Sequence, residues 1–148
     1  MKLKTKKKTI QIIVLLMSLF LVAEIFYLSW LPNGRLGKET YLPLWLLNLS
    51  NTYFNLRTAI PFTVLSFLIE ACYSIESKPL FDTCKIPFWL INITIATVIV
   101  CLAEGGQFFI TDRYPDLMDV TFGIFGSILG CVLFHIFNII ILLIFIIK

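Results

Sequence analysis

Four long runs of apolar residues, separated by polar segments, restrict the fold of this chain more than any other feature of its sequence. The runs cover about 10–31, 58–73, 86–103 and 119–147, and a helix of about 20 apolar residues crosses the roughly 30 Å hydrocarbon core of a bilayer. With 59% apolar and 14% charged residues, the composition departs from the roughly 45–50% and about 25% of soluble domains. The sequence therefore predicts an all-α integral membrane protein, a four-helix bundle in a single membrane domain over 1–148, and excludes a cytosolic enzyme fold.

A basic segment, 1–8, precedes the first run and resembles the start of a signal peptide. The run exceeds the roughly 7–15 apolar residues of such a peptide, and no small-residue cleavage site follows it, so we expect it to stay as a crossing helix. The stretch 41–47 is too short to span a bilayer, and its aromatic residues favour a position at the membrane interface.

The distribution of cations predicts the orientation of the helices, whereas the net charge of +3 is too small to indicate nucleic-acid binding. If the N-terminus is inside, the cytoplasmic face holds Lys2, Lys4, Lys6, Lys7, Lys8, Lys78, Lys85 and Lys148, and the other face holds Arg35, Lys38, Arg57 and Arg113. By the positive-inside rule, both termini are then cytoplasmic, and the segments 32–57 and 104–118 face outward.

The densest group of polar side chains lies between the third and fourth runs and comprises Glu104, Gln107, Arg113, Asp116 and Asp119. Charged groups beside hydrocarbon are costly, usually face a bundle interior or a water-filled cavity, and mark a candidate site. Glu104 and Gln107 are three residues apart, as are Asp116 and Asp119, so each pair shares one helix face. Either aspartate can cap the last helix, where carboxylates meet the free backbone N–H groups.

Three glycines follow on the same face of the last helix, because Asp119, Gly123, Gly126 and Gly130 have helical spacing. Small residues let a neighbouring helix approach closely. We expect this packing to hold Asp119 near Glu104, Gln107 or Arg113. A structural interpretation, in which the aspartates cap a helix and Arg113 is their counter-ion, stays open beside that of a ligand site.

These residues resemble the VanZ family of small bacterial membrane proteins, whose pattern is E-x-x-Q-x5-R-x-x-D-x-x-D-x3-N-x-x-G-x3-G. Seven positions carry the pattern here: Glu104, Gln107, Arg113, Asp116, Asp119, Gly126 and Gly130. Gly123 replaces the usual asparagine. An earlier element is matched by Asn55 and Pro61-Phe62, with Thr63 in place of a glycine, and a weaker likeness lies at Ser29-Trp-Leu-Pro32. The resemblance covers about 55–132 and implies a protein of the bacterial cytoplasmic membrane that is associated with teicoplanin resistance.

Several other residues are candidates of less specific kinds. Asp112, Asp116, Asp119 and Glu104 have the ligand type of a hard divalent cation, but Pro115 interrupts their register, so we predict no metal and no cofactor. Glu24 lies within the first run, where it either takes part in a proton or substrate path or pairs with Arg113 or Arg57.

His135 lies about 160° around the last helix from the glycine face, so we expect it, with Asn138, to hydrogen-bond another helix rather than to join the cluster. The cysteines fall in or beside apolar runs without the spacing of a metal site, and we interpret them as small apolar fillers: Cys72, Cys84, Cys101 and Cys131.

The function expected from the residues and the resemblance together is recognition of an anionic, lipid-linked partner, a cell-wall precursor or a glycopeptide. Arg113 would bind its phosphate or carboxylate, the carboxylates Glu104, Asp116 and Asp119 would orient the arginine, and Gln107 would add a hydrogen bond. One alternative is a membrane enzyme that uses Glu104 or Asp119 as general base. Another is a structural subunit that docks a larger membrane protein through the glycine face.

Overall fold

The computed structural model describes residues 2–32, 43–44, 48, 52–75, 86–111 and 113–146. Within them the chain forms α1 (Lys2–Ser29), α3 (Phe54–Ile75), α4 (Phe88–Gly106), the short 3-10 helix η2 (Gln107–Phe109) and α5 (Leu117–Ile146). Several residues on which expectations depend lie outside the described residues: the interfacial stretch 41–47 apart from 43–44, the cations Arg35, Lys38, Lys78, Lys85 and Lys148, and also Asp112 and Cys84.

Four of these helices are long and apolar enough to cross a membrane, with candidate spans Thr5–Ser29, Asn55–Ile75, Phe88–Phe109 and Leu117–Ile144. The prediction of an all-α, four-helix membrane protein is confirmed for the described residues, and the chain is a multi-pass membrane protein. Their large apolar side chains are mostly exposed, as expected when the solvent is hydrocarbon.

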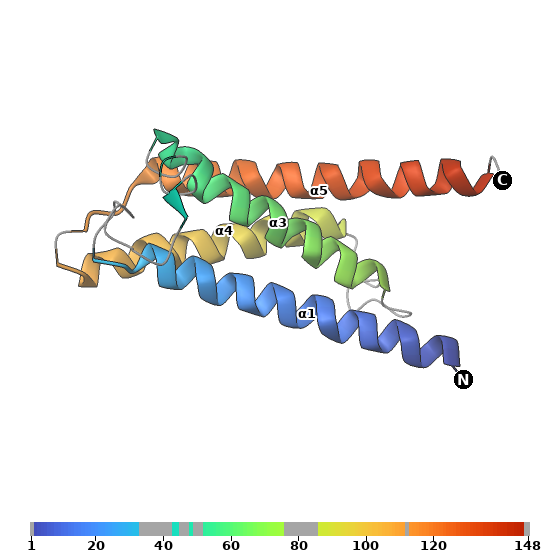
Figure 1. The fold of residues 1–148 in the computed structure, drawn as a ribbon. Helices are drawn as coiled ribbons and strands as arrows, with labels where there is room; N and C mark the ends of the chain where they lie inside the picture. The colour runs from blue at the N-terminus through green and yellow to red at the C-terminus, as the bar shows by residue number, and fades with distance from the viewer. Residues whose placement is uncertain are drawn as a thin grey trace.

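The helices α1 and α4 run in one direction along the bundle, and α3 and α5 run in the opposite direction (Figure 1). The end of α1 and the end of α4 meet the beginnings of α3 and α5 at one end of the bundle, while both chain termini lie at the opposite end. Which end faces the cytoplasm stays a prediction from the cation count.

The helix α3 begins at Phe54, about four residues before the predicted span. The hydropathy pattern stops at the polar residues Asn55 and Arg57, but the helix continues through them because they lie at the end of the bundle rather than in its apolar middle. This earlier start brings Arg57 into the same region as the polar residues of α4 and α5.

The most extensive helix contact joins α3 and α5, and the glycines of α5 make it possible. A Cβ atom on Gly126 would collide with the backbone carbonyl of Ala59, and one on Gly130 with the carbonyl of Thr63. Gly123 faces α4, where a Cβ would lie only 2.9 Å from a methyl group of Val100. The glycine face therefore packs against α3 and α4 of the same chain, at backbone distance from α3.

Candidate functional site

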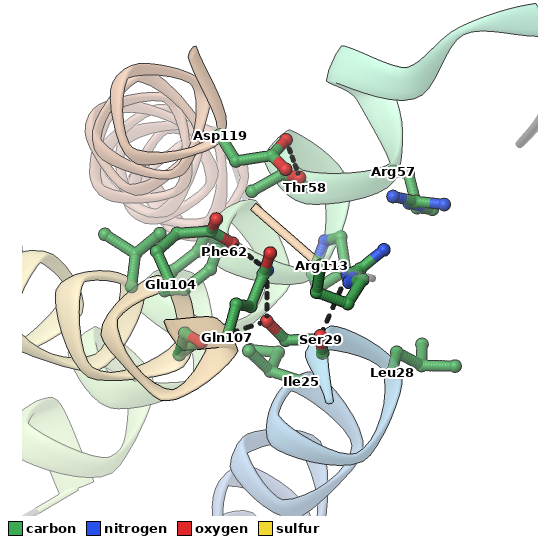
Figure 2. Close-up of a pocket in the computed structure, with 13 residues that line it drawn as sticks. Ile25, Leu28, Ser29, Arg57, Thr58, Phe62, Glu104, Gln107, Arg113 and Asp119 are labelled. Atoms are coloured by element: carbon green, nitrogen blue, oxygen red, sulfur yellow. Dashed lines mark hydrogen bonds between the residues drawn. The ribbon is translucent and has the colours of Figure 1, made fainter. Parts of the chain in front are cut away.

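A cavity of about 50 Å³ lies where the four helix ends meet, and we call it the end pocket. Its lining combines apolar side chains of α1, α3 and α4 with seven polar residues: Ser29, Arg57, Thr58, Glu104, Gln107, Arg113 and Asp119. Figure 2 shows the two guanidinium groups on one side of the pocket and the carboxylate of Glu104 on the other. Of the five residues predicted to form the site, four line this pocket, and Asp116 lies beside it.

Gln107 connects α4 to the end of α1. Its Nε2 donates to Oε1 of Glu104, at 2.9 Å, and to Oγ of Ser29, at 3.0 Å. The Ser29 hydroxyl in turn donates to the carbonyl of Ala103, at 3.2 Å, and the indole N–H of Trp30 donates to the same carbonyl, at 3.1 Å. Because Gln107 and Glu104 are both buried, these bonds fix the wall of the pocket.

The second carboxylate oxygen of Glu104 holds the segment that leads into α5. Its Oε2 accepts the backbone N–H of Asp116, at 3.1 Å. The Asp116 side chain caps α5, because its Oδ1 accepts the N–H of Met118, at 2.8 Å, while the residue stays exposed. Asp116 thus occupies the capping position that the sequence predicted for one of the two aspartates.

Arg113 is oriented by the end of a helix rather than by the three carboxylates. Its Nη2 donates to the carbonyl oxygen of Ser29, at 2.8 Å. Ser29 ends α1, where carbonyl groups lack helical partners and the helix dipole favours a cation. The Nε–H of Arg113 is buried without a hydrogen-bond partner among the described residues. This leaves a donor of a charged group in need of an acceptor, a costly situation in a buried position.

Asp119 and Arg57 complete the end pocket from α5 and α3. Oδ1 of Asp119 accepts the hydroxyl of Thr58, at 2.7 Å, and so joins the first turns of the two helices. Sequence reasoning counted Arg57 only as a cation of the outer face and as one possible partner of Glu24. The general expectation that a charge next to an apolar run marks a site would have found it.

The cavity has room for more than one water molecule, since about 10–15 Å³ of such volume suffices for one. Two guanidinium groups line it, and the carboxylates of Glu104 and Asp119 already accept hydrogen bonds from protein groups. Because the Nε–H of Arg113 has no acceptor, the arrangement suits a small group that brings oxygen acceptors, such as a phosphate or a carboxylate.

A second polar group, the inner polar cluster of Ser66, Glu70, Asn92 and Cys131, lies between α3, α4 and α5. Nδ2 of Asn92 lies 2.9 Å from the carbonyl of Ser66, 3.1 Å from Oε1 of Glu70 and 3.4 Å from Sγ of Cys131. The thiol of Cys131 donates to the same Glu70 oxygen, at 3.6 Å. Glu70 is 4% exposed and Asn92 is fully buried.

This inner polar cluster was not predicted from the sequence. Glu70 was assigned no role from the sequence, and Cys131 was interpreted as an apolar filler, although it takes part in hydrogen bonds. The rule that singled out Glu24 as an intramembrane acid applies equally to Glu70.

The remaining candidates lie away from the end pocket. Glu24 is exposed on α1 and lines an apolar groove between α1 and α3. His135 is exposed on α5, with its ring 5.9 Å from that of Phe134. Over the described residues, no three His, Cys, Asp or Glu side chains form a group that could hold a metal ion.

Comparison of the chain with protein-family models, with curated proteins and with solved structures finds no match. The geometry of the end pocket is therefore the main evidence on function.

Proposed function

We propose that this chain is a VanZ-like protein of the bacterial cytoplasmic membrane that binds an anionic, lipid-linked partner in the end pocket. Through this binding it lowers susceptibility to teicoplanin-type glycopeptides. One observation carries the proposal: the buried Nε–H of Arg113 lacks an acceptor among the residues that the structure describes, while the residue lines a cavity of about 50 Å³. A guanidinium group binds phosphate or carboxylate with paired hydrogen bonds, and Arg57 supplies a second one to the same cavity.

The distribution of the VanZ-like residues supports the same proposal. Glu104, Gln107, Arg113 and Asp119, from the later part of the pattern, all line the end pocket. The two earlier elements of the pattern contribute Pro61, Phe62, Ser29 and Trp30. The pocket is lined by Pro61, Phe62 and Ser29, and the indole N–H of Trp30 donates to the carbonyl of Ala103 in its wall. If the pattern describes a binding site, its residues are expected to meet around one cavity although they lie far apart in the chain.

Substitution of Arg113 tests this proposal. We expect Arg113→Lys to restore drug susceptibility while the protein stays at its normal level in the membrane, because a point ammonium cannot replace a planar guanidinium. The measurement is the teicoplanin concentration that inhibits growth of cells expressing each variant. Tyr114→Phe is the matched control, since Tyr114 adjoins Arg113 but is 87% exposed and outside the pocket. Unchanged resistance in the lysine variant at normal abundance would refute anion recognition by Arg113.

Recognition of an extracellular partner also requires the end pocket to face outward. The cation count of eight against four predicts this orientation. In a chain that lacks the four native cysteines, a cysteine at Thr111 should react with a membrane-impermeant thiol reagent in intact cells, whereas one at Ser77 should react only after permeabilisation, with the cysteine-free chain as the labelling control. The reverse pattern would place the pocket in the cytoplasm and exclude an extracellular partner.

An enzyme that acts on a lipid-linked cell-wall precursor is the second candidate, and Asp119 is the observation that favours it. Its carboxylate lines the end pocket and accepts a hydrogen bond from Thr58 at one oxygen, which leaves the other available as a base. Incubation of the purified protein with a polyprenyl-linked precursor and a divalent cation, followed by mass spectrometry, separates the two candidates. A mass change that Asp119→Asn abolishes would support the enzyme, and an unaltered precursor would support binding alone.

The third alternative is a subunit that docks a larger protein through its glycine face. The packing of that face within this chain argues against it. That face packs against α3 and α4 of the same chain and is buried there. A partner protein would need another surface.

A further inference from the structure

An apolar groove of about 420 Å³ runs along the contact between α1 and α3. Leu16, Met17, Phe20 and Glu24 line it from α1, and Val64 and Leu68 line it from α3. Phe20 is 72% exposed and Leu16 is 59% exposed, so the groove opens toward the bilayer rather than into the bundle. A hydrocarbon chain can therefore enter it from the side.

The groove continues the end pocket along the same two helices. On α1, Glu24 in the groove lies four residues before Leu28, which lines the pocket, so the two residues share one helix face. On α3, Pro61 lines the pocket, and Val64 in the groove lies three residues later on the same helix face. From Ser29 in the pocket to Leu16 in the groove the helix rises roughly 20 Å, at about 1.5 Å per residue. That length covers a headgroup and the roughly 15 Å depth of one leaflet.

We propose that the end pocket and this groove form one binding site for a lipid phosphate, a single hydrocarbon chain that ends in a phosphate group. The phosphate lies in the pocket and accepts hydrogen bonds from Arg113 and Arg57, and the chain lies in the groove. This inference rests on the proposed function, because it assigns the anion of that proposal to a membrane lipid. It adds the place of the chain, its lateral route of entry and the helices that hold it.

The sizes and the chemistry of the end pocket and the groove together point to a lipid phosphate as the occupant. The polar cavity of about 50 Å³ accepts a compact oxyanion, and the buried Nε–H of Arg113 needs an oxygen. The groove is larger, apolar and open to hydrocarbon, so it matches a chain and offers little to free phosphate.

The test measures the affinity of the purified full-length protein, in a nonionic detergent, for hexadecyl phosphate, inorganic phosphate and hexadecanol by native mass spectrometry. We expect hexadecyl phosphate to bind most tightly, because it alone fills both volumes. Val64→Trp fills the groove and should lower the affinity for hexadecyl phosphate toward that for inorganic phosphate, because the indole ring takes the place of the chain. Its affinity for inorganic phosphate should not change.

Ile60→Trp is the matched control, because Ile60 on the same helix is 49% exposed, as against 45% for Val64, and lies outside the groove. If Val64→Trp fails to fold, Leu16→Trp blocks the groove from α1, and Leu19→Trp, outside it, is the corresponding control. Helical content by circular dichroism and the elution volume show that each variant is intact.

Arg113→Gln separates this inference from the function on which it rests. If Arg113→Gln weakens binding of hexadecyl phosphate while Val64→Trp has no more effect than Ile60→Trp, the groove is not the chain site and anion recognition stands. If Arg113→Gln leaves the affinity for hexadecyl phosphate unchanged, anion recognition by Arg113 is refuted, and the proposed function is refuted with it. A dimer that Val64→Trp dissociates, with unchanged affinity for hexadecyl phosphate, would assign the groove to a second copy of the chain and overturn the inference.

Discussion

The end pocket and the inner polar cluster place charged groups in one helix bundle in opposite ways. In the inner polar cluster, Glu70 meets its donors directly, and the oxygens left without hydrogen bonds, Asn92 Oδ1 and Ser66 Oγ, are neutral. In the end pocket, the unpartnered group belongs to the Arg113 cation and the residue lines an open cavity. An unsatisfied charged donor costs more than a neutral acceptor. We therefore propose that the cluster serves helix assembly and the pocket serves ligand binding.

The largest expected effect comes from a substitution that damages both regions together. Gly126 lies on α5 between Asp119 of the pocket and Cys131 of the cluster, and any Cβ there collides with backbone of α3. We expect Gly126→Ala to lower the free energy of unfolding by about 3 kcal/mol, the upper end for overpacking, because backbone cannot give way as a side chain can. Denaturation in detergent, followed by circular dichroism, measures it.

Gly105→Ala is the control for that substitution, since a Cβ on Gly105 meets nothing within 4 Å. This variant should be at least as stable as the parent chain, because alanine favours a helix over glycine. Equal destabilisation by the two alanines would mean that close approach of α3 and α5 does not hold the bundle together.

A smaller effect should fall on the inner polar cluster alone. Asn92→Leu keeps the size of the side chain but removes the amide that serves Ser66 and Glu70, so stability should fall by about 2 kcal/mol. Binding of hexadecyl phosphate should not change. Thr94→Leu is the control, because the hydroxyl of Thr94 is exposed and bonds only within its own helix. Lost binding at unchanged stability would reverse the roles assigned to the two regions.

The smallest effect tests the hydrogen bond that closes the end pocket between α3 and α5. Thr58→Val removes the donor to Asp119 at nearly constant volume, and we expect a loss of about 0.5–1 kcal/mol in stability. Affinity for hexadecyl phosphate should fall slightly, since Asp119 loses a fixed position. Thr97→Val, whose hydroxyl bonds within α4, provides the baseline for removing a helix hydroxyl. If Thr58→Val lowered stability more than Asn92→Leu does, the hydrogen bond of the end pocket would hold the helices together more strongly than the inner polar cluster does.

The fold was predictable because each crossing helix is a local property of a continuous apolar run. Part of the site was predictable for the same reason, since Glu104 and Gln107 share a helix turn and do bond each other. The inner polar cluster joins residues from three helices, with Cys131 far from Glu70 in sequence, and spacing along one helix cannot show which helices meet. Arg113 was found as a cation, but its partner is a backbone carbonyl, which has no signature in the sequence.

The glycine contacts between α3 and α5 also determine which wall of the end pocket can move. Helices that touch at backbone distance have no compliant side chains between them, so these two behave as one rigid frame. Against this frame α1 packs lightly, with 11% of an apolar 18-residue stretch of it buried as against 28% for α3, and its end is held by the hydrogen bonds of Ser29 and Trp30. Of the helices that form the end pocket, α1 is therefore the one whose displacement would disturb the least packing.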